Sequence, residues 1–363
     1  MPRHRSTSDP TPPCYAMVFP GLESIAAQEI VQDLRAEVKK TEEGIVIFRA
    51  PEINSRLLQL RTVEDVFLFA WGTDELTYRA ADLERIRRWT DRQADWAQLL
   101  RIHHAIRPKP KGKPSFRIVV QMSGKHGYRR VDARKALAEG LAGKLPPSWR
   151  YAEENASVEF WLTINNATAV CGLRLSDRSM RHRAYKKEHA PASLRPTIAA
   201  AMVRLAELKP LHTILDPMCG VGTILAEILA VPTRYAVPPL VLGGDVSMSV
   251  LRAAGINLRR LGKAHLLRWD ATALPLADES IDRIVCNPPF GKQLASPEQI
   301  PELYRGLIHE SNRVLRTGGR AVILAGDART IKESAAKVGW KPLRQLRVRV
   351  LGMPAAITVW KKE

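Results

Sequence analysis

The sequence of 363 residues has no long apolar run and few cysteines, and each lack excludes a class of protein. No stretch reaches the roughly 18 apolar residues that a membrane-spanning helix needs, so we expect no membrane association. The cysteines lie too far apart for a C-x-x-C motif, so we expect no metal site; they are Cys14, Cys171, Cys219 and Cys286. The opening MPRHRSTSDPTPP lacks the apolar core of a secretory signal. We therefore expect residues 1–14 to be a disordered leader and the protein to be cytoplasmic.

Acidic residues are outnumbered, with 37 Asp and Glu against 56 Lys and Arg, which gives a formal net charge of +19. Such a balance favours a polyanionic partner, most often nucleic acid. Residues 101–135 are the densest basic cluster, with 11 Lys or Arg and one acidic residue, Asp132. Within it, SGKHGYRR (123–130) places an aromatic ring among cations, which suits phosphate contacts and base stacking. A solvated loop face remains the alternative interpretation.

The pattern of elements divides the chain into four parts after the leader. Residues 15–72 and 73–175 each predict a small α+β unit, the second with one long helix over 81–104 and a hairpin turning at Asn165-Asn166. Residues 176–195 form a basic linker. From 196 to 363, short apolar runs alternate with helical segments, which predicts a doubly wound parallel sheet.

Four expected strands of the last part end in polar or glycine-rich residues, and such strand ends gather at one edge of a parallel sheet. They are LDPMCGVGT (215–223), GGD (243–245), RWDA (268–271) and NPPF (287–290). Glycines in the first allow close approach of a ligand. Asp216 can hold a cationic amine, and Asp245 suits a pair of ribose hydroxyls. Asp270 suits the exocyclic amine of adenine, with the Ala271 N–H available to a ring nitrogen.

Each strand end also has a plainer explanation when taken alone. The Gly-Val-Gly run can be a helix cap, and Asp245 can be the N-cap of a following helix. A pyridine dinucleotide would need a third glycine, but position 225 is Leu. The four ends together favour a nucleoside-containing cofactor.

The motif D-P-M-C-G-x-G-T resembles the first motif of class I S-adenosylmethionine-dependent methyltransferases, and N-P-P-F resembles the motif of amino-methyltransferases. An aryl amine is a poor nucleophile because its lone pair is delocalised. The Asn287 oxygen and the Pro288 carbonyl can accept its hydrogens, while the prolines hold both acceptors in place. Phe290 offers a face for base stacking.

The front half resembles the THUMP-domain RNA methyltransferases in FPGLESIAAQEI, FRIVVQMSGKHGYRRVDARKALAEGL and GLRLSDRSMRHRAYKKEHAPASLRPTIAAAM. The resemblance implies a ferredoxin-like domain (15–72), a THUMP domain (73–175) and a Rossmann-like class I methyltransferase domain (196–363). It also implies a monomer that transfers a methyl group from S-adenosylmethionine to the N2 of a guanosine in tRNA, at position 6 of the acceptor stem.

The resemblance and the patterns together yield three sets of site residues. The expected catalytic residues are Asn287, Pro288, Pro289 and Phe290. The expected cofactor-binding residues are Asp216, Met218, Cys219, Gly220, Gly222, Thr223, Asp245, Val246, Asp270, Ala271 and Asn287. The expected RNA-binding residues are Lys109, Lys111, Lys113, Lys125, Arg129, Arg130, Arg134, Arg181, Arg183, Lys186 and Lys187.

Three alternatives remain open at this point. The first is guanine-N2 methylation at another RNA site, such as tRNA position 10 or ribosomal RNA. The second is adenine-N6 methylation of DNA, which would use the same four strand ends but leave the front half unexplained. The third is an RNA-binding or chaperone protein whose methyltransferase fold is vestigial, against which the intact Asp216, Asp245, Asp270 and Asn287 argue.

Overall fold

The structure is a computed structural model that describes residues 11–107, 112, 114–191, 193–231, 239–290 and 298–363. The chain divides into two compact units. The first comprises Met1–Met17 and Ala27–Met180, and the second comprises Val18–Ala26 and Arg181–Glu363. Residues 1–10 of the expected leader lie outside the described residues, and Cys14 already begins the first strand.

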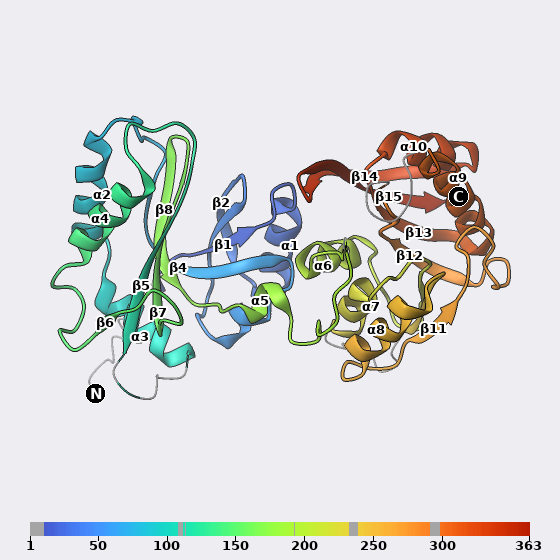
Figure 1. The fold of residues 1–363 in the computed structure, drawn as a ribbon, viewed down its shortest axis with the longest axis horizontal. Coiled ribbons are helices and arrows are strands. Elements are labelled where there is room, and N and C mark those ends of the chain that lie inside the picture. The colour runs from blue at the N-terminus through green and yellow to red at the C-terminus, as the bar shows by residue number, and fades with distance from the viewer. Residues whose placement is uncertain (1–10, 108–111, 113, 192, 232–238, 291–297) are drawn as a thin grey trace, which may run out of the picture. The chain divides into compact units, whose positions relative to one another are not determined.

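The first unit is built on one eight-stranded sheet with the order β2-β3-β1-β4-β8-β7-β5-β6. Helices α2 and α4 pack against each other, and α4 also packs on β5 (Figure 1). The elements that lie wholly or partly in it are β1 (Cys14–Val18), α1 (Glu23–Leu34), β2 (Glu37–Glu42), β3 (Ile45–Arg49), a 3-10 helix (Ser55–Gln59), β4 (Val63–Thr73), α2 (Ala81–Arg92), α3 (Trp96–Ile106), β5 (Ser115–Ser123), α4 (Arg130–Leu141), β6 (Arg150–Tyr151), β7 (Val158–Asn165), β8 (Thr168–Arg174) and α5 (Ser179–His182).

Strand β4 joins what the sequence divided into two α+β units. It lies between β1 and β8 in the sheet and pairs antiparallel with β8, with Phe67 opposite Arg174. Its eleven residues span the expected boundary at 72/73, and the pattern analysis did not anticipate either β4 or β2. One continuous sheet therefore carries both halves of the unit.

Two local expectations in the first unit were wrong. The helix expected over 81–104 is interrupted between α2 and α3, because the Asp95 side chain accepts from the Gln98 N–H at 2.9 Å and starts a new helix. The hairpin turns one residue later than expected. Asn165 pairs with Thr168, so the turn residues are Asn166 and Ala167, and Asn166 has a φ of 53°.

The second unit contains a seven-stranded sheet with the order β11-β10-β9-β12-β13-β15-β14. Its elements are α6 (Pro196–Leu205), β9 (Thr213–Asp216), α7 (Thr223–Leu229), β10 (Leu240–Asp245), α8 (Met248–Leu258), β11 (His265–Arg268), β12 (Ile281–Cys286), α9 (Ile300–Val314), β13 (Leu315–Ala325), α10 (Ala328–Lys337), β14 (Trp340–Val350) and β15 (Met353–Lys362). Across the sheet, neighbouring strands are parallel in the part β11-β10-β9-β12-β13. Strand β15 is antiparallel to both β13 and β14.

Helices α6, α7 and α8 form one packed group, and α9 with α10 forms another (Figure 1). Buried apolar side chains of α9 and of the central strands make the core on the α9 side, among them Ile284, Leu307 and Ile323. The expected alternation of strands and helices is therefore observed. Among the helices of the described residues, none is long and apolar enough to cross a membrane.

Candidate active site

The four strand ends named from the sequence lie at the same edge of the second sheet. β9 is central, with β10 paired on one side and β12 on the other. The chain crosses from one side of β9 to the other after β11, so the crevice beyond β9 is a topological switch point. This is where an open α/β sheet binds its ligands.

The loop after β9 needs its two glycines for different reasons. Gly220 and Gly222 have φ of 50° and 78°, a region that favours glycine. A Cβ at position 222 would lie 3.2 Å from the Cβ of Ala254 on α8. At position 220, no atom of the described residues lies within 4 Å of where a Cβ would be. Gly222 thus allows helix packing, and Gly220 leaves its backbone open to a ligand.

Asp245 ties this loop to the end of β10. One carboxylate oxygen accepts from the Gly220 N–H at 3.1 Å and the other accepts from the Ser247 N–H at 3.0 Å. Ser247 itself is the N-cap of α8 and makes no side-chain cap hydrogen bond. Asp245 therefore holds the backbone of both the glycine loop and the turn before α8, so it does more than cap a helix. The adjacent Val246 exposes 61% of its surface at the same edge.

Asp216 is 1% exposed at the end of β9, where its Oδ1 accepts from the Met218 N–H at 3.3 Å. Burial raises the pKa of its carboxyl well above the ordinary value, and the charge of Asp245 raises it further. Cys219 and Thr223 are buried behind the loop. The Cys219 N–H donates to the Gly244 carbonyl at 2.8 Å. A cation bound at this edge would relieve the unfavourable burial of Asp216.

Trp269 holds the first loop from the other side, and sequence reasoning missed it. Its Nε1 donates to the Pro217 carbonyl at 3.0 Å. A Cβ at Gly244 would lie only 2.0 Å from the indole, so the ring packs directly on the backbone of β10. The signal was present as a tryptophan before Asp270 and a glycine pair in β10, but only their contact explains both.

The end of β11 is formed by Asp270 and Ala271. One oxygen of the exposed Asp270 side chain accepts from the N–H and the hydroxyl of Thr272, at 2.8 and 2.7 Å. The other oxygen forms no hydrogen bond within the described part of the chain and is available to a donor. Ala271 is 2% exposed.

The Asn-Pro-Pro-Phe corner follows β12. The Asn287 side-chain oxygen is buried and has no hydrogen-bond partner among the described residues. Such an acceptor is costly unless a ligand satisfies it. Pro288 is buried, and Phe290 packs against Gly326, where a Cβ would lie 3.3 Å from the ring carbon Cγ.

Asn257 on α8 connects the basic linker to the glycine loop, and sequence reasoning missed it as well. Its Oδ1 accepts from the N–H groups of Lys187 and Glu188, both at 2.9 Å. Its Nδ2 donates to the carbonyls of Glu188 at 3.1 Å and Val221 at 3.0 Å. The side chain is 3% exposed and uses its full hydrogen-bonding capacity on backbone groups.

The expected RNA-binding residues of the linker have different surroundings. Arg183 is 9% exposed, with its Nε 3.3 Å from Glu227 of α7, which favours a structural role over the expected phosphate contact. Lys186 donates to the Leu194 carbonyl at 2.5 Å, and burial lowers its pKa to about 8. Lys187 is exposed and Arg181 is half-buried.

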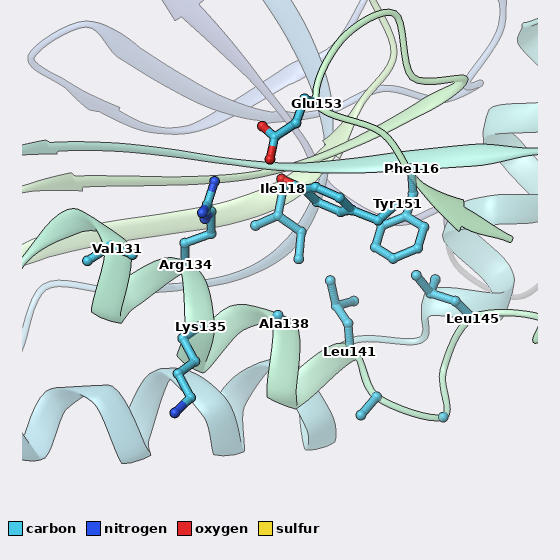
Figure 2. A pocket seen from close by; sticks show the side chains of 12 residues that line it. Phe116, Ile118, Val131, Arg134, Lys135, Ala138, Leu141, Leu145, Tyr151 and Glu153 are labelled. Carbon is cyan, nitrogen blue, oxygen red and sulfur yellow. The ribbon is translucent and has the colours of Figure 1, made fainter.

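In the first unit, Lys125, Arg129, Arg130 and Arg134 are exposed on and before α4. Lys109, Lys111 and Lys113 lie outside the described residues. Arg134 lines a cavity of about 480 Å³ between α4 and the strands β5 and β6. Figure 2 shows the rings of Phe116 and Tyr151 and the side chain of Ile118 on the sheet side of this cavity.

Within the described ranges, no three His, Cys, Asp or Glu side chains cluster as metal ligands. The edge of the second sheet thus offers a glycine loop, buried and exposed carboxylates, and an amide oxygen that no described residue bonds. Residues 183–353 match the family model described as RMKL-like, methyltransferase domain. This part of the chain, which makes up most of the second unit, is therefore similar to a methyltransferase domain.

Curated proteins similar to this chain act on guanine N2 by their names. The tRNA (guanine(6)-N(2))-methyltransferase THUMP3 of Mus musculus is 30% identical over 264 residues, 68% of this chain and 51% of the relative. The U6 snRNA (guanine-N(2))-methyltransferase THUMPD2 of Bos taurus is 34% identical over 230 residues, 62% of this chain and 44% of the relative. The chain thus spans about half the length of the curated relatives it matches.

The structure of TrmN from Thermus thermophilus superposes on this chain with a TM-score of 0.75 at 24% identity, covering 97% of this chain and 99% of that one. This likeness shows a shared fold. The expected fold class, a doubly wound class I methyltransferase domain preceded by α+β structure, is therefore confirmed.

Proposed function

We propose that this protein transfers a methyl group from S-adenosylmethionine to the exocyclic N2 of a guanosine in tRNA, at position 6 of the acceptor stem. The observation that carries the proposal is the buried Asn287 oxygen, which has no hydrogen-bond partner among the described residues. It lies at the sheet edge that also carries the glycine loop and the carboxylates of Asp216, Asp245 and Asp270. An acceptor in this position suits an amine whose hydrogens must be held during methyl transfer.

The residues present fit the cofactor in three respects. Gly220 leaves open space at the crevice, and the Asp245 carboxylate can accept hydrogen bonds from ribose hydroxyls. A cationic ligand would stabilise the charged form of the buried Asp216. Asp270 and Ala271 would meet the adenine. The remaining expected cofactor-binding residues would line the same crevice; they are Met218, Cys219, Gly222, Thr223 and Val246. When bound, S-adenosylmethionine supplies the electrophilic methyl group.

The chain's own part in the reaction is to position the amine. Asn287 Oδ1 and the Pro288 carbonyl would accept its two hydrogens and direct the nitrogen lone pair at the methyl group. The N–C bond forms as the S–C bond breaks, and the product ammonium then loses a proton to water. A duplex would hide the amine, so the guanine is flipped out and stacked on Phe290.

We also propose the domain assignment that the resemblance implies. Residues 15–72 form a ferredoxin-like domain, residues 73–175 a THUMP domain and residues 176–195 a linker in a cytoplasmic, monomeric protein. The exposed cations Lys125, Arg129, Arg130 and Arg134 would bind phosphates without reading sequence. The neighbouring cavity, with aromatic and aliphatic walls, would take an unpaired base at the 3′ end of the acceptor stem.

The names of the relatives support guanine N2 as the acceptor and tRNA position 6 as the site. A second candidate is a guanine of U6 small nuclear RNA, because an equally related protein carries that name. Both candidate functions would use the same catalytic residues, so they differ only in which RNA is methylated.

The experiment incubates full-length protein and S-adenosylmethionine with tRNA or U6 transcripts and measures N2-methylguanosine by nucleoside mass spectrometry. We expect the product in tRNA, mapped to position 6. Asn287→Ala should reduce the rate by about a hundredfold, whereas Asn312→Ala, which only loses a bond from Trp340, should not. Methylation of U6 alone would replace the tRNA substrate, and no N2-methylguanosine in either RNA would overturn the proposal.

A further inference from the structure

The catalytic corner has little means of holding its own shape. Pro288 and Pro289 have no N–H to donate, so only carbonyl groups remain to anchor the backbone between Asn287 and Phe290. Proline fixes φ, but the peptide planes can still rotate about ψ. An anchor for these carbonyls must therefore come from another element.

Tyr304 of α9 provides that anchor. Its hydroxyl donates to the Pro289 carbonyl at 2.9 Å, and among the described residues this is the only side-chain hydrogen bond to the corner. The tyrosine is fully buried in the core cluster that also contains Cys286, the last residue of β12. The ring cannot move away without disturbing this core, so the hydroxyl is a rigid donor.

The same hydroxyl also reaches the end of the neighbouring strand. The backbone of Gly326, directly after β13, lies beside it. Gly326 is the residue against which Phe290 packs. Burial raises the pKa of Tyr304, so its hydroxyl stays protonated and continues to donate at physiological pH. Tyr304 therefore links the corner, β13 and the Phe290 contact.

We propose that Tyr304 is a positioning residue for methyl transfer, which orients the Asn287 and Pro288 acceptors and the face of Phe290 by fixing the Pro289 carbonyl. This inference rests on the proposed function and deepens it. Its hydroxyl bonds to the backbone of the corner and not to a group that reacts. It acts on the reaction only through the geometry of the corner.

The test compares Tyr304→Phe, which keeps the buried ring, with Thr358→Val, which removes another buried hydroxyl of the same domain. Thr358 is 2% exposed, and its hydroxyl donates to the Ile323 carbonyl at 3.2 Å and not to the corner. We expect kcat of Tyr304→Phe to fall at least about tenfold. In Tyr304→Phe, the KM for RNA and the Kd for S-adenosylhomocysteine should stay within about twofold of the wild-type values. Thr358→Val should lower Tm about as much as Tyr304→Phe does, but it should leave kcat unchanged.

An unchanged kcat in Tyr304→Phe would overturn the inference. An equal loss of kcat in Thr358→Val would overturn it as well, because the loss would then follow from a general destabilisation of the domain core. Hydrogen exchange at the Phe290 amide gives a second measurement that does not need activity. It should be faster in Tyr304→Phe than in wild type or Thr358→Val, and equal exchange would contradict the anchoring role. If the wild-type protein methylates no RNA, the proposed function fails, and the exchange comparison still decides whether Tyr304 anchors the corner.

Discussion

Asn257 in the last turn of α8 donates through Nδ2 to the Val221 carbonyl, 3.0 Å away, and so holds the glycine loop. The same side chain accepts from the linker N–H groups of Lys187 and Glu188. The cofactor loop and the basic linker are thus bonded to one buried amide. Any movement of either segment that breaks these bonds leaves buried polar groups without partners.

Asn257→Ala should weaken binding of S-adenosylhomocysteine, because the Val221 carbonyl loses its donor and the loop must be ordered on binding. We expect a loss of roughly 1–3 kcal/mol by calorimetry. Asn257→Asp keeps the acceptor for the linker but removes the donor to Val221, so it should weaken the ligand as well. Ile256→Ala, on the exposed side of the same helix, is the control. An unchanged affinity in Asn257→Ala would show that the loop holds its shape alone.

Asp245→Ala should weaken S-adenosylhomocysteine by roughly 1.5–3 kcal/mol, because charge-assisted hydrogen bonds to the ribose are lost. The Gly220 N–H would also lose its acceptor. Asp245→Asn retains an oxygen acceptor and should be affected less. Equal affinity in wild type and Asp245→Ala would mean that the carboxylate serves only to order the turn before α8.

Binding of the cationic cofactor should release a proton from Asp216. Burial raises the pKa of this carboxyl in the free protein, so it keeps its proton to a higher pH than an exposed aspartate. A neighbouring positive charge favours the carboxylate and lowers the pKa. Affinity should therefore rise with pH between the lowered and the raised pKa, and the calorimetric enthalpy should depend on the buffer. Asp216→Asn should abolish both effects, and a buffer-independent enthalpy in wild type would contradict the prediction.

The methyltransferase domain should be more stable as fragment 181–363 than as fragment 191–363. The shorter fragment lacks Arg183 and Tyr185, which bond to the fully buried Glu227 at 3.3 and 2.6 Å. Breaking a buried pair costs roughly 3–5 kcal/mol, so Tm should fall by several degrees. Glu227→Gln should restore part of the loss in fragment 191–363 only, because it removes a buried charge that has lost two of its hydrogen-bond donors. Equal Tm values would show that the linker contributes nothing to the domain.

Local patterns in the sequence determined the doubly wound methyltransferase domain and the four strand ends. Apolar runs of strand length alternate there with helices, and parallel strands bring their carboxyl ends to one edge, so residues far apart in sequence had to meet. The same logic failed in the first unit. β4 and β2 carry no clear alternation, and β4 joins two expected units because it pairs with β8.

Only the tertiary structure identified the residues that hold the site in shape. Trp269, Asn257 and Tyr304 belong to no motif, and each acts through a hydrogen bond to a backbone carbonyl distant in sequence. Burial likewise assigned Arg183 to an internal ion pair, although its charge suggested a contact with RNA. A motif shows which groups a strand delivers to a site, because that depends on local order. The support for those groups depends on packing between elements, which a linear pattern does not contain.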